Sequence, residues 1–245
     1  MRAQDSFFAN LTPLKSFDPR LLRGDKDVPQ EVCNLVLALA CFFNDWKDMQ
    51  LAFYSLSRVK PSEPKGETPA WGEFNGLVWH LIRLQVSSLH ETLSFVKKTK
   101  SAVEHPYFQN IIQHLPDSKR QVWNALADAS SDAGETEFGE FCMLIRNKVA
   151  FHYDGKTLFQ GYSGWFLDPA AKKKPYLSRG TARVNERFYF AEASAQSYFE
   201  SLLDTKGLAP KKIMSLCDNV GQALSKIVKD FIDSREVGVE KRNRT

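Results

Sequence analysis

The stretch Glu135–Tyr153, ETEFGEFCMLIRNKVAFHY, has the pattern of an α-helix that is covered on two faces. With about 100° of rotation per residue, several apolar side chains and one histidine fall within roughly 80° of one another: Phe138, Phe141, Ile145, Val149 and His152. Leu144 and Phe151 lie on the other side of the helix. Acidic residues in the first turns complement the positive end of the helix dipole, and Gly155 follows the last turn. This helix is therefore expected at the centre of a bundle or at a dimer interface.

Apolar residues at helical spacing continue on both sides of this stretch. Pro29 suits the first turn of a long helix that ends before the proline-rich loop 61–66. That helix carries a stripe of large apolar side chains, Val32, Leu35, Val36, Leu39, Phe43 and Trp46. The same spacing predicts further helices at 73–100, 105–114, 117–129, 192–203 and 210–235. The expected fold class is therefore all-α, a helical bundle.

Two segments interrupt the helical pattern. Residues 156–190 are rich in glycine, proline and aromatic residues, so we predict an irregular insert with one or two short strands. Residues 1–27 contain prolines and only short apolar clusters, and we predict that they form an N-terminal arm. Residues 28–245 are numerous enough to bury a sizeable core, and we predict that they form a single helical domain carrying the insert.

The composition is that of an ordinary globular protein, with 43% hydrophobic and 25% charged residues. The longest uncharged run, Val32–Asn44, is shorter than the roughly 20 apolar residues that a membrane-spanning helix needs, so we predict no membrane partner. The N-terminus has no apolar stretch followed by a cleavage site, which makes the cytoplasm the expected compartment. A formal net charge of +4 is too modest to indicate a nucleic-acid partner by itself.

Metal sites, cofactor sites and disulfides have no support in the sequence. The cysteines are scattered without a C-x-x-C pair and are expected to be reduced thiols of the core: Cys33, Cys41, Cys142 and Cys217. The histidines lack the spacing of metal ligands, and neither a glycine-rich phosphate loop nor a G-x-S-x-G turn occurs. We therefore predict no metal and no cofactor.

A possible catalytic motif lies within the first stretch, in the order Arg146-Asn147-Lys148-Val149-Ala150-Phe151-His152. This string resembles the signature of the HEPN superfamily, in which an arginine, usually followed by a polar residue, precedes a histidine with four to six residues between them. Five residues intervene here, and the continuation Phe151-His152-Tyr153-Asp154 is similar to abortive-infection and related HEPN families. The resemblance covers about ten residues together with a compatible order of helices.

The resemblance implies a HEPN-type bundle that acts as a metal-independent endoribonuclease, with a composite site at a homodimer interface. It also implies a role in toxin–antitoxin systems or antiphage defence, with RNA as substrate and an antitoxin or another regulatory protein as a further partner. The residue types suit this chemistry. Neutral His152 can take the proton of a ribose 2′-hydroxyl or supply one to the departing oxygen. Arg146 can bind the phosphorane oxygens as negative charge accumulates there. Asn147 would orient the histidine, the phosphate or the partner chain.

The spacing of the motif raises a geometric problem. On a regular helix Arg146 and His152 point roughly 120° away from each other, so both cannot easily hold one phosphate. Either the helix unwinds near His152 or two copies of the chain meet. In HEPN families the site is commonly composite, with the motifs of two copies facing each other.

A second arginine–histidine pair has a similar spacing. Six residues separate Arg83 from His90, but Leu84 follows the arginine. Both side chains are expected on the solvent face of the helix 73–100. We interpret this pair as a coincidence.

A basic segment follows the motif helix, and its cations are Lys172, Lys173, Lys174, Arg179, Arg183 and Arg187. Asp168 and Glu186 are its acidic residues, and aromatic residues are interleaved with the cations: Trp165, Phe166, Tyr176 and Phe188. Cations bind phosphates and aromatic rings stack on bases, so the segment is predicted to guide RNA next to the motif. A solvated basic loop is the alternative.

Two other functions remain open. The first is a catalytically inactive HEPN-like module that binds RNA, a nucleotide or a protein through the same cleft. The second is a helical interaction protein in which Arg146 is a buried ion-pair partner. Cleavage of RNA in excess EDTA would separate a ribonuclease from both.

Overall fold

The computed structural model describes residues 16–64, 68–131, 137–150, 154–170, 173–179, 186–205 and 210–243. Its long helices are α2 (Gln30–Arg58), α3 (Pro69–Lys98) and α10 (Pro210–Asn243). Shorter helices fill the space between and beside them: α4 (Lys100–Val103), α5 (Pro106–Gln113), α6 (Asp117–Ser131), α7 (Glu137–Ile145), α8 (Gly155–Tyr162) and α9 (Tyr189–Thr205). These ranges contain no β-strand, only one isolated β-bridge, so the all-α prediction is confirmed.

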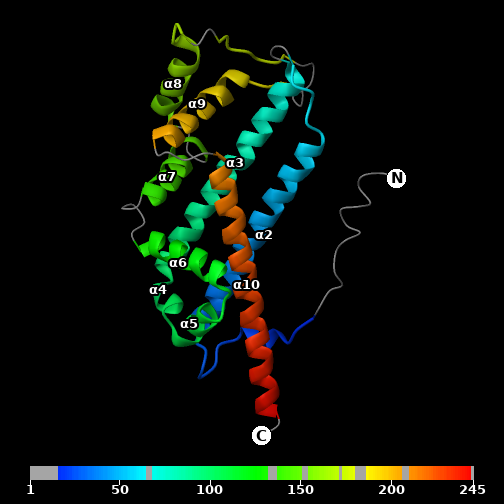
Figure 1. Cartoon of the computed structure of the whole chain (residues 1–245), viewed down its shortest axis with the longest axis vertical. Coiled ribbons are helices and arrows are strands. Elements are labelled where there is room, and N and C mark those ends of the chain that lie inside the picture. The colour runs from blue at the N-terminus through cyan, green and yellow to red at the C-terminus, as the bar shows by residue number, and fades with distance from the viewer. Residues whose placement is uncertain are drawn as a thin grey trace, which may run out of the picture.

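The core lies where α2, α3 and α10 run side by side (Figure 1). The helices α4, α5 and α6 cover one end of this group, while α8 and α9 lie at the end where α3 begins. The predicted stripes form the core, including Val36 and Leu39 of α2, Leu89 of α3, and Leu224 and Phe231 of α10. Each such side chain, when fully buried, contributes about 1.5–3 kcal/mol to the stability of the folded state. None of the described helices is long and apolar enough to cross a membrane.

The helix α3 is covered on more sides than its sequence pattern predicts. It packs against α2, α6, α7, α9 and α10. As a result, polar positions opposite its apolar stripe are also removed from solvent, including Arg83 and Ser87. The prediction that Arg83 lies on a solvent face is therefore wrong, because neighbouring helices cover a face that the pattern of α3 alone marks as polar.

The predicted irregular insert 156–190 is helical in its first part. Asp154 caps α8 by accepting a hydrogen bond from the Thr157 backbone N–H. The chain then continues through a π-helical turn, η3 (Ser163–Leu167), before it becomes irregular. In the described part of the remainder, the short strands that we predicted are reduced to one isolated bridge between Ser178 and Arg187.

The glycine at 161 explains why this helix escaped prediction. A Cβ atom at Gly161 would lie 2.0 Å from the carbonyl oxygen of Ser194, so the backbones of α8 and α9 touch here. Gly161 therefore serves close helix packing, whereas the sequence pattern marks it as a breaker of the helix.

Replacing Gly161 with alanine is expected to destabilise the protein by about 2 kcal/mol, because the clash is with backbone and forces the two helices apart. Gly155→Ala is the matched control, since a Cβ atom there has open space around it and α8 already begins at that residue. The control should be neutral or slightly stabilising. Urea unfolding would measure both changes, and equal stability of the two variants would contradict the close contact.

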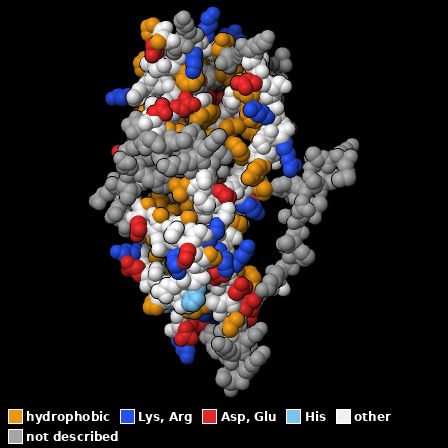
Figure 2. All heavy atoms as spheres, in the orientation of Figure 1, with side chains coloured by type: hydrophobic (Ala, Val, Ile, Leu, Met, Phe, Trp, Pro, Cys, Tyr) orange, Lys and Arg blue, Asp and Glu red, His pale blue; other side chains and the backbone are white. Residues whose placement is uncertain are grey.

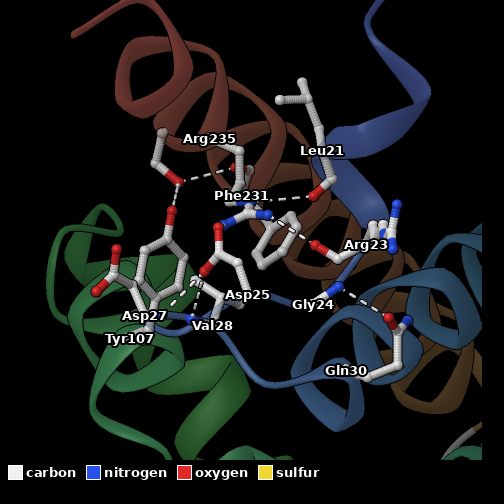
Figure 3. A network of polar contacts seen from close by, with 11 residues as sticks. Leu21, Arg23, Gly24, Asp25, Asp27, Val28, Gln30, Tyr107, Phe231 and Arg235 are labelled. Carbon is white, nitrogen blue, oxygen red and sulfur yellow. Dashed lines mark hydrogen bonds and ion pairs between the residues drawn. The ribbon is translucent and has the colours of Figure 1, made fainter. Parts of the chain in front are cut away.

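Part of the predicted N-terminal arm belongs to the bundle. Residues 1–15 lie outside the described residues, but Pro19–Leu22 forms a short 3₁₀ helix, η1, and Leu21 is buried in the core. Arg235 of α10 holds this segment (Figure 3). Its Nε donates to Leu21 O at 3.0 Å, its Nη1 to Asp25 Oδ2 at 2.9 Å, and its Nη2 to Arg23 O at 2.9 Å. The sequence pattern missed this docking because its polar partner is far away in the chain.

Candidate functional site

The motif begins in a distorted turn. We predicted one regular helix over 135–153, but α7 ends at Ile145 and the chain continues as a π-helical turn, η2 (Arg146–Ala150), packed against α3. Single π-helical turns inside helices occur often at functional sites. Residues 151–153, and with them His152, lie outside the described residues. The widened turn changes the direction of the side chains from Arg146 onward compared with a straight helix.

Arg146 is held at the surface by two side chains. Its Nε donates to Glu91 Oε1 at 3.0 Å, and its Nη1 donates to Asn147 Oδ1 at 2.9 Å. The Arg146 side chain is 32% exposed to solvent. Its Nη2 makes no hydrogen bond to a described residue, so this nitrogen can bind a phosphate oxygen. Arg146 is thus both oriented and accessible.

Asn147 orients the arginine in this structure. The sequence left its partner open among the histidine, the phosphate and the partner chain, and the observed contact is with the adjacent Arg146. Asn147 is partly buried and lies in the same π-helical turn. Its amide oxygen fixes the guanidinium plane together with Glu91.

His90 lies beside Arg146 and Glu91, although its spacing from Arg83 was interpreted as a coincidence. Its Nδ1 is 3.7 Å from Glu91 Oε1 and finds no hydrogen-bond partner among the described residues. Burial lowers the pKa of His90, and the charge of Arg146 lowers it further, while Glu91 acts in the opposite direction. His90 is therefore neutral near pH 7. No local pattern links His90 to Arg146, because they meet through the packing of two helices.

His90 also borders a small cavity with a mostly apolar surface. The cavity has a volume of about 310 Å³ and lies between α3 and α7. Ser94, Lys97 and Lys98 of α3 line it together with His90. The lysines close α3 and complement the negative end of its dipole, as their position in the last turn predicts.

The chain on either side of residues 151–153 is held together. The backbone N–H of Asp154 donates to Lys148 O at 3.2 Å, and Lys148 Nζ lies 3.3 Å from Asp154 Oδ2. The hydrogen bond from Thr157 and the neighbouring Lys148 hold the pKa of Asp154 below its usual value. Asp154 is thus ionised at neutral pH and connects the end of the motif to the start of α8.

The basic segment lies at a distance from Arg146. Lys172 and Arg183 lie outside the described residues, and Arg179 is exposed. Lys173 and Lys174 line a cleft beside the start of α3. Trp79 of α3 lines the same cleft. Trp79 precedes Glu91 by about three helical turns, or about 18 Å along α3. The expectation that this segment adjoins Arg146 within one chain is therefore wrong, because α8 and η3 carry the chain to the other end of α3.

Arg187 has a structural role that differs from its predicted RNA contact. Its Nη2 lies 2.6 Å from Glu192 Oε1, its Nε donates to Glu192 Oε2 at 2.9 Å, and its Nη1 pairs with Glu73. The hydrogen bonds from Arg187 to Glu192 keep the pKa of the guanidinium above its usual value. Since its charge is already balanced by two carboxylates, Arg187 contributes little to binding phosphates.

The described residues offer few other reactive groups. No three His, Cys, Asp or Glu side chains in the described ranges come together as ligands for a metal ion. Burial raises the pKa of Cys142 above its usual value and that of Cys217 to about 12, so both thiols stay protonated. Cys41 is exposed, so the prediction that all cysteines are core thiols is wrong for this residue.

Comparison with family models, curated proteins and solved structures yields no match to this chain. The described geometry combines an oriented arginine, an amide and a carboxylate at the protein surface. The Arg146 guanidinium can bind a phosphate group that approaches it, whereas the Glu91 carboxylate repels phosphate and only orients the arginine.

Proposed function

We propose that this protein is a metal-independent endoribonuclease of the HEPN type. The observation that carries the proposal is the display of Arg146 from a π-helical turn, oriented by Glu91 and Asn147, in a string that resembles the HEPN signature. His152 supplies the acid–base group of that signature. The biological setting is a toxin–antitoxin system or antiphage defence, with an antitoxin or another regulatory protein as partner. This setting follows from the resemblance.

The proposed reaction uses the nucleophile that RNA already contains. His152 removes the proton of the ribose 2′-hydroxyl, and the 2′-oxygen attacks the adjacent phosphorus. Arg146 binds the phosphorane oxygens, which carry more negative charge than in the ground state. The bond to the 5′-oxygen then breaks, and that oxygen takes up a proton. The products are a 2′,3′-cyclic phosphate and a 5′-hydroxyl.

The proposed site is composite and forms between two copies of the chain. The π-helical turn alters the direction of Arg146 relative to a straight helix, but the motif still spans the point where α7 ends and α8 begins. A second copy places another Arg146 and His152 on the opposite side of the RNA, as in HEPN families. Two guanidinium groups can then share one phosphate.

The composite site predicts that the protein is a homodimer. Light scattering at micromolar concentration should give twice the mass of the 27.9 kDa chain. Dilution to the monomer should lower the cleavage rate per chain. A monomer that cleaves RNA at full rate would contradict the composite site, while leaving the roles of Arg146 and His152 open to test.

A second candidate function is a catalytically inactive HEPN-like binding module. The observation that favours it is the ion pair of Arg146 with Glu91, since a carboxylate at 3.0 Å already balances the arginine charge. In that case the protein binds RNA, a nucleotide or a protein partner through the same surface. Glu91→Gln would then strengthen RNA binding without producing cleavage.

The test of the proposed function is RNA cleavage by purified protein in excess EDTA. The expected products carry a 2′,3′-cyclic phosphate, which phosphatase treatment after acid opening identifies. A requirement for added divalent metal would exclude the mechanism. Binding of RNA without cleavage under any of these conditions would favour the inactive module.

A further inference from the structure

A cleft lined by aromatic residues lies away from the motif, between the start of α3, η3 and the start of α9. Its volume is about 300 Å³, at the lower end of the range of small-molecule sites. Aromatic side chains form much of its lining, among them Trp79, Trp165, Tyr176 and Tyr189. Figure 2 shows hydrophobic and charged side chains interleaved over this end of the molecule. The cleft has room for one planar ring system with its substituent.

The floor of the cleft is fixed by close contacts with α3. A Cβ atom at Gly72 would lie 2.6 Å from the Tyr189 ring, and one at Gly76 would lie 2.3 Å from Arg187 Nη2. These glycines let Tyr189 and Arg187 rest directly on the helix backbone. Tyr189 also donates its hydroxyl to Pro69 O at 3.2 Å. A floor held in this way is preformed, which lowers the entropy cost of binding a ligand.

The open side of the cleft is positively charged. Lys173 and Lys174 line it, and Lys173 Nζ lies 3.1 Å from the centroid of the Trp165 ring. The deeper Arg187 is balanced by Glu73 and Glu192, so the lysines are the cations that a ligand would meet. Lys173 covers this face of Trp165, so a planar group can stack there only when Lys173 turns toward an anionic group of the ligand.

We propose that this cleft binds a nucleoside phosphate. The base stacks against Trp165 and Tyr176, and the phosphate binds Lys173 and Lys174. The side-chain amides of Asn75 and Gln196, which also line the cleft, present donors and acceptors to the edge of the base. The ligand is either a free nucleotide or one nucleotide of an RNA strand, because both offer the same chemistry. Binding here does not depend on cleavage at Arg146, because Glu91, the partner of Arg146, lies about 18 Å along α3 from Trp79 of the cleft.

The experiment measures binding of adenosine 5′-monophosphate by calorimetry and by quenching of tryptophan fluorescence. Adenosine and ribose 5-phosphate should bind at least about tenfold more weakly, since each lacks one of the two recognised groups. Tyr176→Ala should weaken binding by about tenfold through the lost stacking, and Lys174→Gln by several-fold through the lost phosphate contact. Tyr176 and Lys174 are exposed, so the variants should fold normally.

The matched controls lie on α8 outside the cleft. Phe159 is an exposed aromatic residue and Lys156 an exposed cation, and neither lines the cleft. Phe159→Ala and Lys156→Gln should therefore leave the affinity unchanged. If all four variants bind the nucleotide equally, the ligand lies elsewhere and the proposal is overturned.

A parallel measurement uses a short single-stranded RNA with the Arg146→Ala variant, so that no strand is cut during binding. Binding of the mononucleotide that depends on Tyr176 and Lys174 identifies a free nucleotide as the ligand. Dependence on these residues for the RNA alone identifies a nucleotide within a strand. If neither ligand binds at millimolar concentration, the proposal fails, whatever the outcome of the cleavage assay.

Discussion

Replacing Arg146 with alanine is expected to lower the rate of RNA cleavage at saturating substrate by at least about a hundredfold, because an oriented group that stabilises transition-state charge is lost. The Arg146 side chain is 32% exposed and contacts Glu91 and Asn147, which do not belong to the hydrophobic core. The variant should therefore keep its thermal stability. Time courses of a labelled RNA in EDTA measure the effect.

Replacing His152 with alanine should lower the same rate by about 10²–10⁴-fold, the usual contribution of a general acid or base. The matched control is His114→Ala, since His114 is an exposed histidine that follows α5. His90→Gln is the informative comparison, because His90 lies close to Glu91 in the Arg146 cluster. Loss of cleavage in His90→Gln with full activity in His152→Ala would transfer the acid–base role to His90 and contradict the HEPN assignment.

Arg146→Lys separates charge from geometry. Lysine keeps the positive charge but cannot make the two directed contacts to Glu91 and Asn147 at once. If Arg146 acts as an oriented fork, this variant should recover only a small part of the wild-type rate. Full recovery would mean that a point charge is sufficient and that Asn147 has no positioning role.

The sequence predicted the long helices well because each carries its own apolar stripe. Val36 and Leu39 of α2, and Leu224 and Phe231 of α10, recur at helical spacing and are all buried. The start of α3 lies earlier than predicted, because Thr68 caps the helix and Pro69 occupies its first position. A cap of this kind can be predicted from sequence. Here the prolines of the preceding loop led us to place the start of the helix too late in the chain.

The helix α8 was missed for a physical reason. Glycine is usually a signal for a turn, but Gly161 is required where two helix backbones meet, and only the position of Ser194 reveals this. Arg187 was misjudged in the same way. Its neighbours in sequence predict an exposed basic segment, while Glu73, far away in the chain, balances its charge.

The candidate site was predicted in its residue types and not in its contacts. Arg146 and Asn147 follow from the motif, but the partner of Arg146 is Glu91, which no spacing rule connects to it. The awkward spacing of Arg146 and His152 indicated either an unwound helix near His152 or a meeting of two copies, but it did not predict a π-helical turn that begins at Arg146. Tertiary packing against α3 determines both features.

Replacing Arg235 with methionine is expected to destabilise the protein by about 3 kcal/mol. The Arg235 side chain is 4% exposed, and its guanidinium donates to Leu21 O, Arg23 O and Asp25 Oδ2. Methionine fills much of the same space but leaves those two carbonyls without this donor and removes the cation from a partly buried carboxylate. Urea unfolding should show a lower midpoint with an unchanged slope.

The control for this prediction is Arg20→Ala in the same N-terminal segment. Arg20 pairs with Asp18, and hydrogen bonds from Arg20 lower the pKa of Asp18 to about 2, but the Arg20 side chain is 75% exposed. Solvent screens such a pair, so its loss should not change stability measurably. Arg235→Lys should fall between the two variants, because one ammonium group cannot reach all three acceptors. If Arg235→Met is as stable as Arg20→Ala, residues 16–27 are not held to the bundle by Arg235. Hydrogen exchange at the Leu21 and Arg23 amides, which bond to Asp18 O and Arg20 O, would show whether η1 is released with the arginine.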